Sequence, residues 1–245
     1  MKIDGKVLAK VITSQIGKEL KGVPKITLAI VTLGPEDAWE HYVAQKIKLA
    51  RELGIQTRLI NIKEPTEEKL ITTIQQLNND ADVAGIIVQR PLTRHIQGEK
   101  ITYAVSPKKD VDGFIKNSFF KPPVWLAVKD ILEYAYRKSQ IANRRTTGDE
   151  RDALAEWLKS QKITVLGKGE TAGMPVIEGL RGLGSDPNII DSQTPNKDEI
   201  VKNSDIIISA VGRSGVFKVE DLKQGVIVIG IGLHREDTKL KPDFD

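Results

Sequence analysis

The sequence predicts an α/β protein of two domains with a cleft between them, each domain built on a parallel sheet. Residues 26–88 alternate short β-branched runs with longer amphipathic segments in the order strand, helix, strand, helix, strand, which is typical of a parallel sheet covered by helices. A second series begins near residue 160, where an apolar run enters a glycine-rich turn, as in Rossmann-like dinucleotide-binding domains. We therefore expect a first domain over residues 1–121 and a second over residues 122–245.

The elements expected in the first domain follow from apolar spacing and from capping residues. Thr66 is a suitable helix N-cap, and the two glutamates after it lie where the helix dipole favours acidic side chains. Gly54 is suited to end a helix, because glycine adopts a left-handed backbone conformation without strain. The expected strands are residues 26–32, 57–62 and 83–88, and the expected helices are residues 38–54 and a segment from Thr66 to about residue 77.

The second domain is expected to contain four strands and a helix after the glycine-rich turn. Between the two series, residues 122–138 start with two prolines and should form a linking helix, while the polar residues 139–150 should form a loop. The expected strands are residues 163–167, 188–190, 205–212 and 225–232, and the helix runs from residue 173 to about residue 183.

Composition narrows the class of function. The chain has 245 residues, of which 40% are hydrophobic and 29% charged, as in ordinary folded proteins. Its 37 basic and 33 acidic residues nearly balance, so the net charge of +4 permits an anionic ligand but is weak evidence for nucleic-acid binding. The absence of cysteine excludes disulfides, thiolate metal sites and a catalytic thiol.

The same survey predicts a cytoplasmic protein without a metal. No apolar run approaches the length of a membrane span, and the first residues lack the apolar stretch of a signal peptide. The three histidines are scattered along the chain, so each is better explained as a surface or internally bonded residue than as a metal ligand.

Three polar residues of the first domain are candidates for chemistry. Tyr42 and Lys46 are four residues apart in an expected helix, so they share one face of it. A ring beside an ammonium can grip a flat heterocycle, and the ammonium can relay protons or hold an activated water. Gln89 follows a buried strand, where ligands bind in parallel sheets, and its neutral amide can orient a lysine. A plain surface helix and a capped strand end would look the same, so these features alone do not establish a site.

Two carboxylates lie close together before a glycine. Asp110 and Asp112 precede Gly113, a pattern that suits either a turn or a metal loop. The rest of a calcium loop is absent, because no glutamate follows at the required place. Asp112 could instead accept hydrogen bonds from a ring N–H and an amino group.

The segment from Gly167 to Gly173 is the candidate phosphate site. Its spacing, with glycines at 167, 169 and 173, is one residue longer than the common dinucleotide fingerprint, but a strand precedes it and a helix follows. A tight strand–helix turn without a ligand is the alternative. Asp191, together with Ser192, follows a strand about twenty residues downstream, where an acid usually accepts from a ribose 2′-hydroxyl and favours NAD.

Taken in order, these motifs resemble the bifunctional methylenetetrahydrofolate dehydrogenase/methenyltetrahydrofolate cyclohydrolase family. The similarity runs from residues 3–6 to residues 243–244, except for an insertion at residues 139–152. Its most specific segments share the order and spacing of the family; they are Tyr42-Val-Ala-Gln-Lys46, Gly85-Ile-Ile-Val-Gln-Arg-Pro91, Lys109-Asp-Val-Asp-Gly113, Gly167 to Pro175, Ala210-Val-Gly212 and the strand around Val228.

The resemblance implies an enzyme of one-carbon metabolism, of the kind that serves purine biosynthesis. It would oxidise 5,10-methylenetetrahydrofolate with NADP and hydrolyse the product to 10-formyltetrahydrofolate, with the folate-binding catalytic domain first and the NAD(P)-binding domain second. Lys46 would be the key catalytic residue and Gln89 would hold it. Asp112 would anchor the pterin, while Tyr42 would flank the aromatic part of the folate. A homodimer through the cofactor domain is also implied.

The choice of cofactor rests on two cues that disagree. The Arg-Ser pair with which the family helps to hold the 2′-phosphate of NADP is Lys168-Gly169 in this chain. Lys168 could still pair with a phosphate, as a point charge, whereas a carboxylate at Asp191 would repel one. We favour NADP on the resemblance, with NAD as the alternative.

Several departures from the family motivate a second hypothesis. Trp39 replaces a serine and Trp125 lies where the family has small residues, so bulk is expected to face the cleft. Gly230 replaces an acidic residue. Relatives also continue beyond residue 244 into a Pro-Gly-Gly-Val-Gly-Pro loop and a closing helix, so a more open pocket is expected. The alternative to an enzyme is therefore a degenerate paralogue that binds folate, nucleotide or a partner chain. RNA binding is not supported, because aromatic and basic residues do not interleave.

Overall fold

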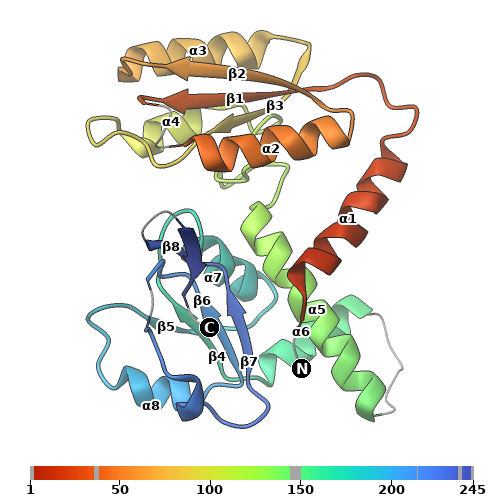
Figure 1. Ribbon diagram of the computed structural model, residues 1–245, viewed down its shortest axis with the longest axis vertical. Coiled ribbons are helices and arrows are strands. Elements are labelled where there is room, and N and C mark those ends of the chain that lie inside the picture. Colours follow the sequence, from red (N-terminus) through yellow and green to blue (C-terminus); the bar gives the residue numbers. More distant parts are fainter. Residues whose placement is uncertain (1–2, 36–38, 144–149, 214, 237–238, 244–245) are drawn as a thin grey trace. The chain divides into compact units, whose positions relative to one another are not determined.

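The computed structural model describes residues 3–35, 39–143, 150–213, 215–236 and 239–243. Contacts divide the chain into two compact units, Met1–Pro123 and Val124–Asp245. Each unit contains a parallel sheet flanked by helices (Figure 1), so the predicted α/β class is confirmed. Within the described residues, no helix combines the length and apolar character that a bilayer span requires.

The first unit is a three-stranded sheet with helices on both faces. Its elements are α1 (Gly5–Glu19), β1 (Thr27–Leu33), α2 (Glu40–Glu52), β2 (Gln56–Ile62), α3 (Glu67–Asn79), β3 (Val83–Val88) and α4 (Gly98–Ala104). The strand order is β2-β1-β3, with both pairs parallel. Alternate residues of β1 face opposite sides: Ala29 and Val31 pack in the cluster that includes α3 and α4, and Ile30 packs in the cluster that includes α2.

The caps of the first unit follow the prediction. The Thr66 hydroxyl accepts a hydrogen bond from the Lys69 N–H at 3.2 Å and begins α3. Gly54 follows the end of α2 with φ +76°, and the Ile55 N–H donates to the Ala50 carbonyl at 2.8 Å. This is a Schellman motif, which satisfies the last carbonyls of a helix. The predicted start of α2 at residue 38 lies outside the described residues.

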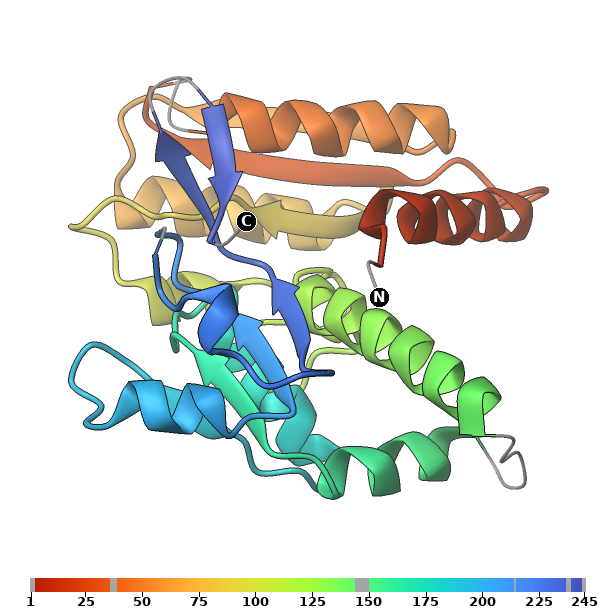
Figure 2. The ribbon, with the colours of Figure 1, turned by 60° about the horizontal axis from the view of Figure 1, so that its bottom comes forward.

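The second unit is a four-stranded parallel sheet in the order β5-β4-β6-β7, with a small antiparallel hairpin after it. Its elements are α5 (Pro123–Asn143), α6 (Glu150–Lys159), β4 (Ile163–Leu166), α7 (Gly173–Gly182), β5 (Asn188–Ile190), α8 (Lys197–Lys202), β6 (Ile206–Ser209), the 3-10 helix η2 (Val219–Asp221), β7 (Ile227–Gly230), β8 (Leu233–Glu236) and β9 (Lys239–Pro242). Helices lie on both sides of this sheet (Figure 2). β4 and β6 are buried along their whole length.

The predicted loop at residues 139–150 is wrong at both ends. α5 continues to Asn143 and α6 begins at Glu150, while residues 144–149 lie outside the described part of the chain. The signal for α6 lies beyond the predicted loop: Leu154 and Leu158, four residues apart, are both buried in the second core. Polar side chains on the outer face of a helix do not prevent the inner face from packing.

The two tryptophans that were expected to face a cleft are core residues. Trp39 is 6% exposed and packs with Ile30, Val43 and Ile87 in the first unit. Trp125 is also 6% exposed and lies in the main core of the second unit. The expectation failed because a residue type does not reveal which face of its helix is buried. Neither tryptophan therefore obstructs a surface in its own unit.

A buried carboxylate fixes the carboxyl end of β6. Asp243 is fully buried and accepts hydrogen bonds from the Ser209 hydroxyl at 2.6 Å and from the Val211 N–H at 3.1 Å. A Cβ added to Gly232 would overlap this carboxylate. The buried Asp243 carboxylate therefore holds the turn that follows β6. Residues of this turn line the pocket of the second unit that is described below.

The packing of Trp125 gives a prediction for two glycines of α7. A Cβ at Gly179 would overlap the Trp125 indole, whereas a Cβ at Gly182 would meet no atom within 4 Å. Gly179→Ala should therefore lower the free energy of unfolding by about 1–3 kcal/mol through overpacking. Gly182→Ala, which only removes backbone freedom, should be neutral or stabilising by up to about 1 kcal/mol. Urea denaturation of both variants tests this; equal effects would contradict it.

Candidate functional site

Two of the candidate residues of the first unit, Lys46 and Gln89, are joined by a hydrogen bond. Lys46 lies in α2, and its Nζ donates to Gln89 Oε1 at 2.9 Å, just beyond β3. The Gln89 Nε2 donates to the Arg90 carbonyl at 2.7 Å, so the amide can present only its oxygen to the lysine. Parallel pairing carries this contact, because the Gln89 N–H donates to the Val31 carbonyl at 2.8 Å and keeps β3 beside β1 beyond its last strand residue.

Tyr42 is four residues before Lys46 in the same helix and is 45% exposed. Its ring meets the His41 ring edge-on, with 5.8 Å between the centroids. The Tyr42 ring is therefore partly open to a ligand on the helix face that also carries Lys46.

Asp112 shares the electrostatic environment of Lys46. Burial raises the pKa of this carboxyl to about 6, the positive charge of Lys46 opposes the rise, and the negative charge of Asp110 adds to it. Arg90 also favours the ionised form. Lys46 is thus hydrogen-bonded to Gln89 and close enough to Asp112 for its charge to act on that carboxyl, so the three residues belong to one group in the first unit.

Asp110 serves as the scaffold of this group rather than as half of a metal site. It is 4% exposed, and its two carboxylate oxygens accept from the Gly113 N–H at 3.1 Å and the Ile115 N–H at 2.9 Å. Gly113 has φ +66°, and a Cβ there would lie 2.6 Å from the Pro122 nitrogen. Glycine is thus required for the turn that presents Asp112.

Arg90 is a neighbour of the group that the sequence did not single out. Its Nη2 donates to the Thr102 hydroxyl at 2.6 Å, and its guanidinium lies 5.6 Å from the centroid of the Phe114 ring. Arg90 and Asp112 line the same small recess. The signal was its position directly after Gln89, at the carboxyl end of a buried strand.

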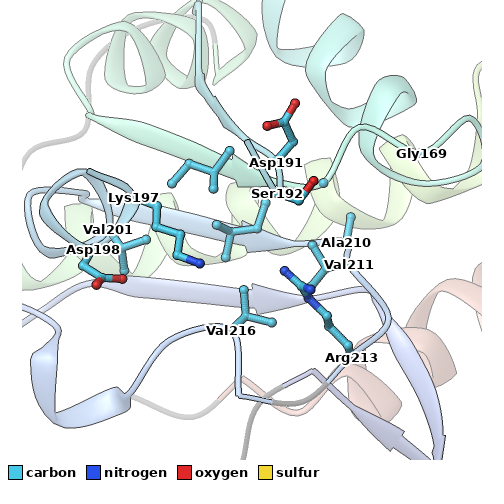
Figure 3. Close-up of a pocket in the computed structure, with 13 residues that line it drawn as sticks. Gly169, Asp191, Ser192, Lys197, Asp198, Val201, Ala210, Val211, Arg213 and Val216 are labelled. Carbon is cyan, nitrogen blue, oxygen red and sulfur yellow. The ribbon is translucent and has the colours of Figure 1, made fainter. Parts of the chain in front are cut away.

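The second unit contains a pocket of about 360 Å³ at the carboxyl ends of its strands (Figure 3). Four of the predicted cofactor residues line it: Gly167, Gly169, Asp191 and Ser192. Gly173 does not line it but begins α7, where a Cβ would overlap the Gly167 carbonyl. The remaining lining residues come from the strand ends, α8 and the loop after β6, and are Leu166, Ile190, Lys197, Asp198, Val201, Ala210, Val211, Arg213 and Val216.

The two cues for cofactor choice form a single ion pair. Lys168 Nζ lies 2.8 Å from Asp191 Oδ2. The carboxylate also accepts from the Gln193 N–H at 2.9 Å and the Thr194 hydroxyl at 3.1 Å. The Lys168 ammonium, these two hydrogen bonds and the lysine charge together lower the pKa of Asp191 to about 2, so the acid stays ionised at any working pH.

Comparison with known proteins gives one consistent result. Residues 3–112 match the family model described as the catalytic domain of tetrahydrofolate dehydrogenase/cyclohydrolase, and residues 152–245 match the NAD(P)-binding domain of the same family. The bifunctional protein FolD of Listeria innocua is 34% identical, over 99% of this chain and 84% of its own length. The FolD of Staphylococcus epidermidis is 31% identical over 98% of this chain and 83% of its own length.

Solved structures of the family share the fold. The bifunctional FolD methylenetetrahydrofolate dehydrogenase/cyclohydrolase from Campylobacter jejuni has a TM-score of 0.79 at 26% identity, covering 99% of this chain and 85% of its own. A 5,10-methylenetetrahydrofolate dehydrogenase from the silkworm Bombyx mori has a TM-score of 0.80 at 27% identity, covering 99% and 84%.

The pKa of Asp112 predicts a pH-dependent change in stability. Its pKa is about 6 in the folded chain against an ordinary value of 3.8, so ionisation costs folding free energy that is absent well below pH 3.8 and fully present well above pH 6. Asp112→Asn removes this cost, which is on the order of 2–3 kcal/mol. The gain in unfolding free energy over the unmodified chain should therefore grow between about pH 4 and pH 6 and then level off.

Urea denaturation at a series of pH values measures this gain. Asp82→Asn, at an exposed position of the same unit, controls for the change in net charge. A gain that is the same at pH 4 and pH 7 would contradict the assignment of the cost to burial of Asp112.

Proposed function

The chain belongs to the tetrahydrofolate dehydrogenase/cyclohydrolase family, and we propose that it is a bifunctional enzyme of one-carbon metabolism. It oxidises 5,10-methylenetetrahydrofolate to 5,10-methenyltetrahydrofolate with NADP, and it hydrolyses the methenyl compound to 10-formyltetrahydrofolate. The observation that carries the proposal is the 2.9 Å hydrogen bond between Lys46 Nζ and Gln89 Oε1, because it holds an amine at the carboxyl end of β3 in the domain that matches the family's catalytic domain.

Residues 1–121 are assigned to folate binding and catalysis, and residues 122–245 to the linking helix and the NAD(P)-binding domain. The division supports separate tasks, because the lysine group and the 360 Å³ pocket lie in different units. The first binds the reacting folate through side chains, and the second offers a glycine turn suited to phosphate.

Lys46 is assigned to the addition of water to the methenyl carbon. The Gln89 amide oxygen accepts a hydrogen bond from the Lys46 amine. The other hydrogens of the amine are available to hold the attacking water. One C–N bond of the methenyl bridge then breaks and leaves the formyl group on N10. A neutral amide positions the amine without adding the charge that a carboxylate would add at the same place.

Asp112 and Tyr42 are assigned to the folate. At pH 7 a carboxyl with a pKa of about 6 is mostly ionised, and can accept hydrogen bonds from a ring N–H and an amino group of the pterin. The half-exposed Tyr42 ring lies on the same helix as Lys46 and offers a flat surface to the aromatic part of the substrate.

NADP, when bound, supplies the hydride acceptor of the dehydrogenase step, and the second unit fits it. Gly167 has φ +90°, and a Cβ there would lie 2.9 Å from the Ala210 carbonyl oxygen, while a Cβ at Gly169 would enter open space. The turn therefore leaves room for a pyrophosphate ahead of α7, whose ten residues favour an anion at its start.

We also propose a homodimeric, cytoplasmic protein, as the family resemblance implies. Light scattering after size-exclusion chromatography measures the mass of the assembly. The alternative of a degenerate paralogue is not favoured by any observation on the described residues, and Trp39 and Trp125, two of the departures that motivated it, are both core residues.

The proposal is tested by a paired spectroscopic assay on the purified chain. One reaction follows hydrolysis of methenyltetrahydrofolate, and the other follows oxidation of methylenetetrahydrofolate with NADP and then with NAD. Turnover in both is expected. Silence in both, from a chain that circular dichroism shows to be folded, would overturn the proposal in favour of a binding protein.

Lys46→Ala gives the residue-level test. Cyclohydrolase turnover should fall by about 10²-fold or more, because loss of a positioned proton-transfer group costs about that much. Lys48→Ala changes an exposed lysine of the same helix and should leave turnover unchanged. If Lys46→Ala hydrolysed the methenyl compound at the normal rate, the assignment of this residue would be wrong.

A further inference from the structure

Two cationic side chains point into the pocket of the second unit from opposite sides (Figure 3). Lys197 comes from the start of α8 and Arg213 from the loop after β6, and both line the pocket. In Figure 3 the Lys197 ammonium and the Arg213 guanidinium point towards the same part of it. Among the residues that the structure describes, neither side chain has an acidic partner within 4 Å. Both are therefore available to an anionic ligand.

Lys168, which stands where the family has arginine, is already paired with an acidic residue. Lys168 is 2.8 Å from Asp191, which two further hydrogen bonds hold in place. The two charges offset each other, so this pair neither attracts nor strongly repels a phosphate. With the pair set aside, the charged residues that line the pocket are Lys197, Arg213 and Asp198, which leaves an excess of positive charge.

We propose that Lys197 and Arg213 together bind the 2′-phosphate of NADP and set the preference of this chain for NADP over NAD. The inference rests on the proposed function in that it assumes a dinucleotide in this pocket. A dianionic phosphate between an ammonium and a guanidinium forms charge-assisted hydrogen bonds with both, and guanidinium is suited to bidentate contact. The 2′-hydroxyl of NAD would leave the two cations without that partner.

A residue with left-handed backbone precedes each of the two cations. Asn196, just before Lys197, has φ +51°, a left-handed conformation that is uncommon for a residue other than glycine. Arg213 follows Gly212, which has φ +62°, and the preceding Val211 N–H is fixed by the buried Asp243 carboxylate. Well-defined turns on both sides reduce the conformational freedom that binding must remove.

Direct binding of nucleotide fragments to the full chain tests the proposal without turnover. Isothermal titration with 2′,5′-ADP and with 5′-AMP compares ligands that differ by the 2′-phosphate. Lys197→Ala and Arg213→Ala should each weaken 2′,5′-ADP binding about tenfold or more, in line with loss of one charge-assisted hydrogen bond. Binding of 5′-AMP should stay within about twofold, which also shows that the pocket is folded.

Lys218→Ala, an exposed lysine of the same unit outside the pocket, is the matched control and should change neither affinity. Asp191→Asn should act in the opposite direction to the cation variants. It releases Lys168 and removes a negative charge, so the preference for 2′,5′-ADP over 5′-AMP should rise several-fold. Loss of both ligands to the same extent, or no change in either, in Lys197→Ala and Arg213→Ala would overturn the inference.

Failure of the proposed function is distinguishable from failure of this inference. A chain that selects 2′,5′-ADP through Lys197 and Arg213 but does not oxidise methylenetetrahydrofolate would contradict the proposed function alone. A chain that is active with NADP and whose preference for 2′,5′-ADP does not depend on the two cations would contradict the inference alone.

Discussion

Parallel pairing of strands is the constraint on which both candidate sites depend. In the main sheet of each unit the strands run in the same direction, so their carboxyl ends meet at one edge. This is why Gln89, at the end of β3, meets a lysine from the helix that follows β1. It is also why the glycine turn after β4, the acid after β5 and the cation after β6 line one pocket. The side chains differ between the units, but the geometry that gathers them is the same.

In the first unit, a few neighbouring groups set the pKa of the Asp112 carboxyl. A buried carboxyl would normally be neutral, and a lysine beside it keeps the ionised form accessible. The amide of Gln89 completes the arrangement without a second charge. Asp110 looks like a partner acid in the sequence, yet its carboxylate holds the backbone of the turn that carries Asp112.

The sequence predicted most of the fold because its signals are local. β3 and β5 have the predicted bounds, and the caps at Gly54 and Thr66 lie where the backbone and side-chain chemistry require them. α6 is absent from the prediction, although Leu154 and Leu158 are four residues apart, a spacing typical of one buried helix face. The tryptophans were misplaced because burial depends on the packing partner, and neither Trp39 nor Trp125 reveals its partner in the sequence.

The candidate site was predictable only in its separate parts. The positions of Tyr42, Lys46 and Gln89 in the sequence indicate which side chains can lie close together. The direction of the Gln89 amide, in contrast, depends on a hydrogen bond to the Arg90 carbonyl. Lys168 and Asp191 give opposite cues for the cofactor as long as their contact is unknown. Their 2.8 Å contact joins residues 23 positions apart in the chain, and such a pairing becomes visible only when the fold brings two turns together.

The contact between Trp125 and Gly179 has a consequence for how this sequence can change over generations. A large ring at one position requires the absence of a side chain at the other, so neither can be exchanged freely while the other is kept. Lineages with a small residue at position 125 gain space at position 179 and are free to fill it. The two positions should therefore vary together among descendants of this chain, and a change at one should open an evolutionary route at the other.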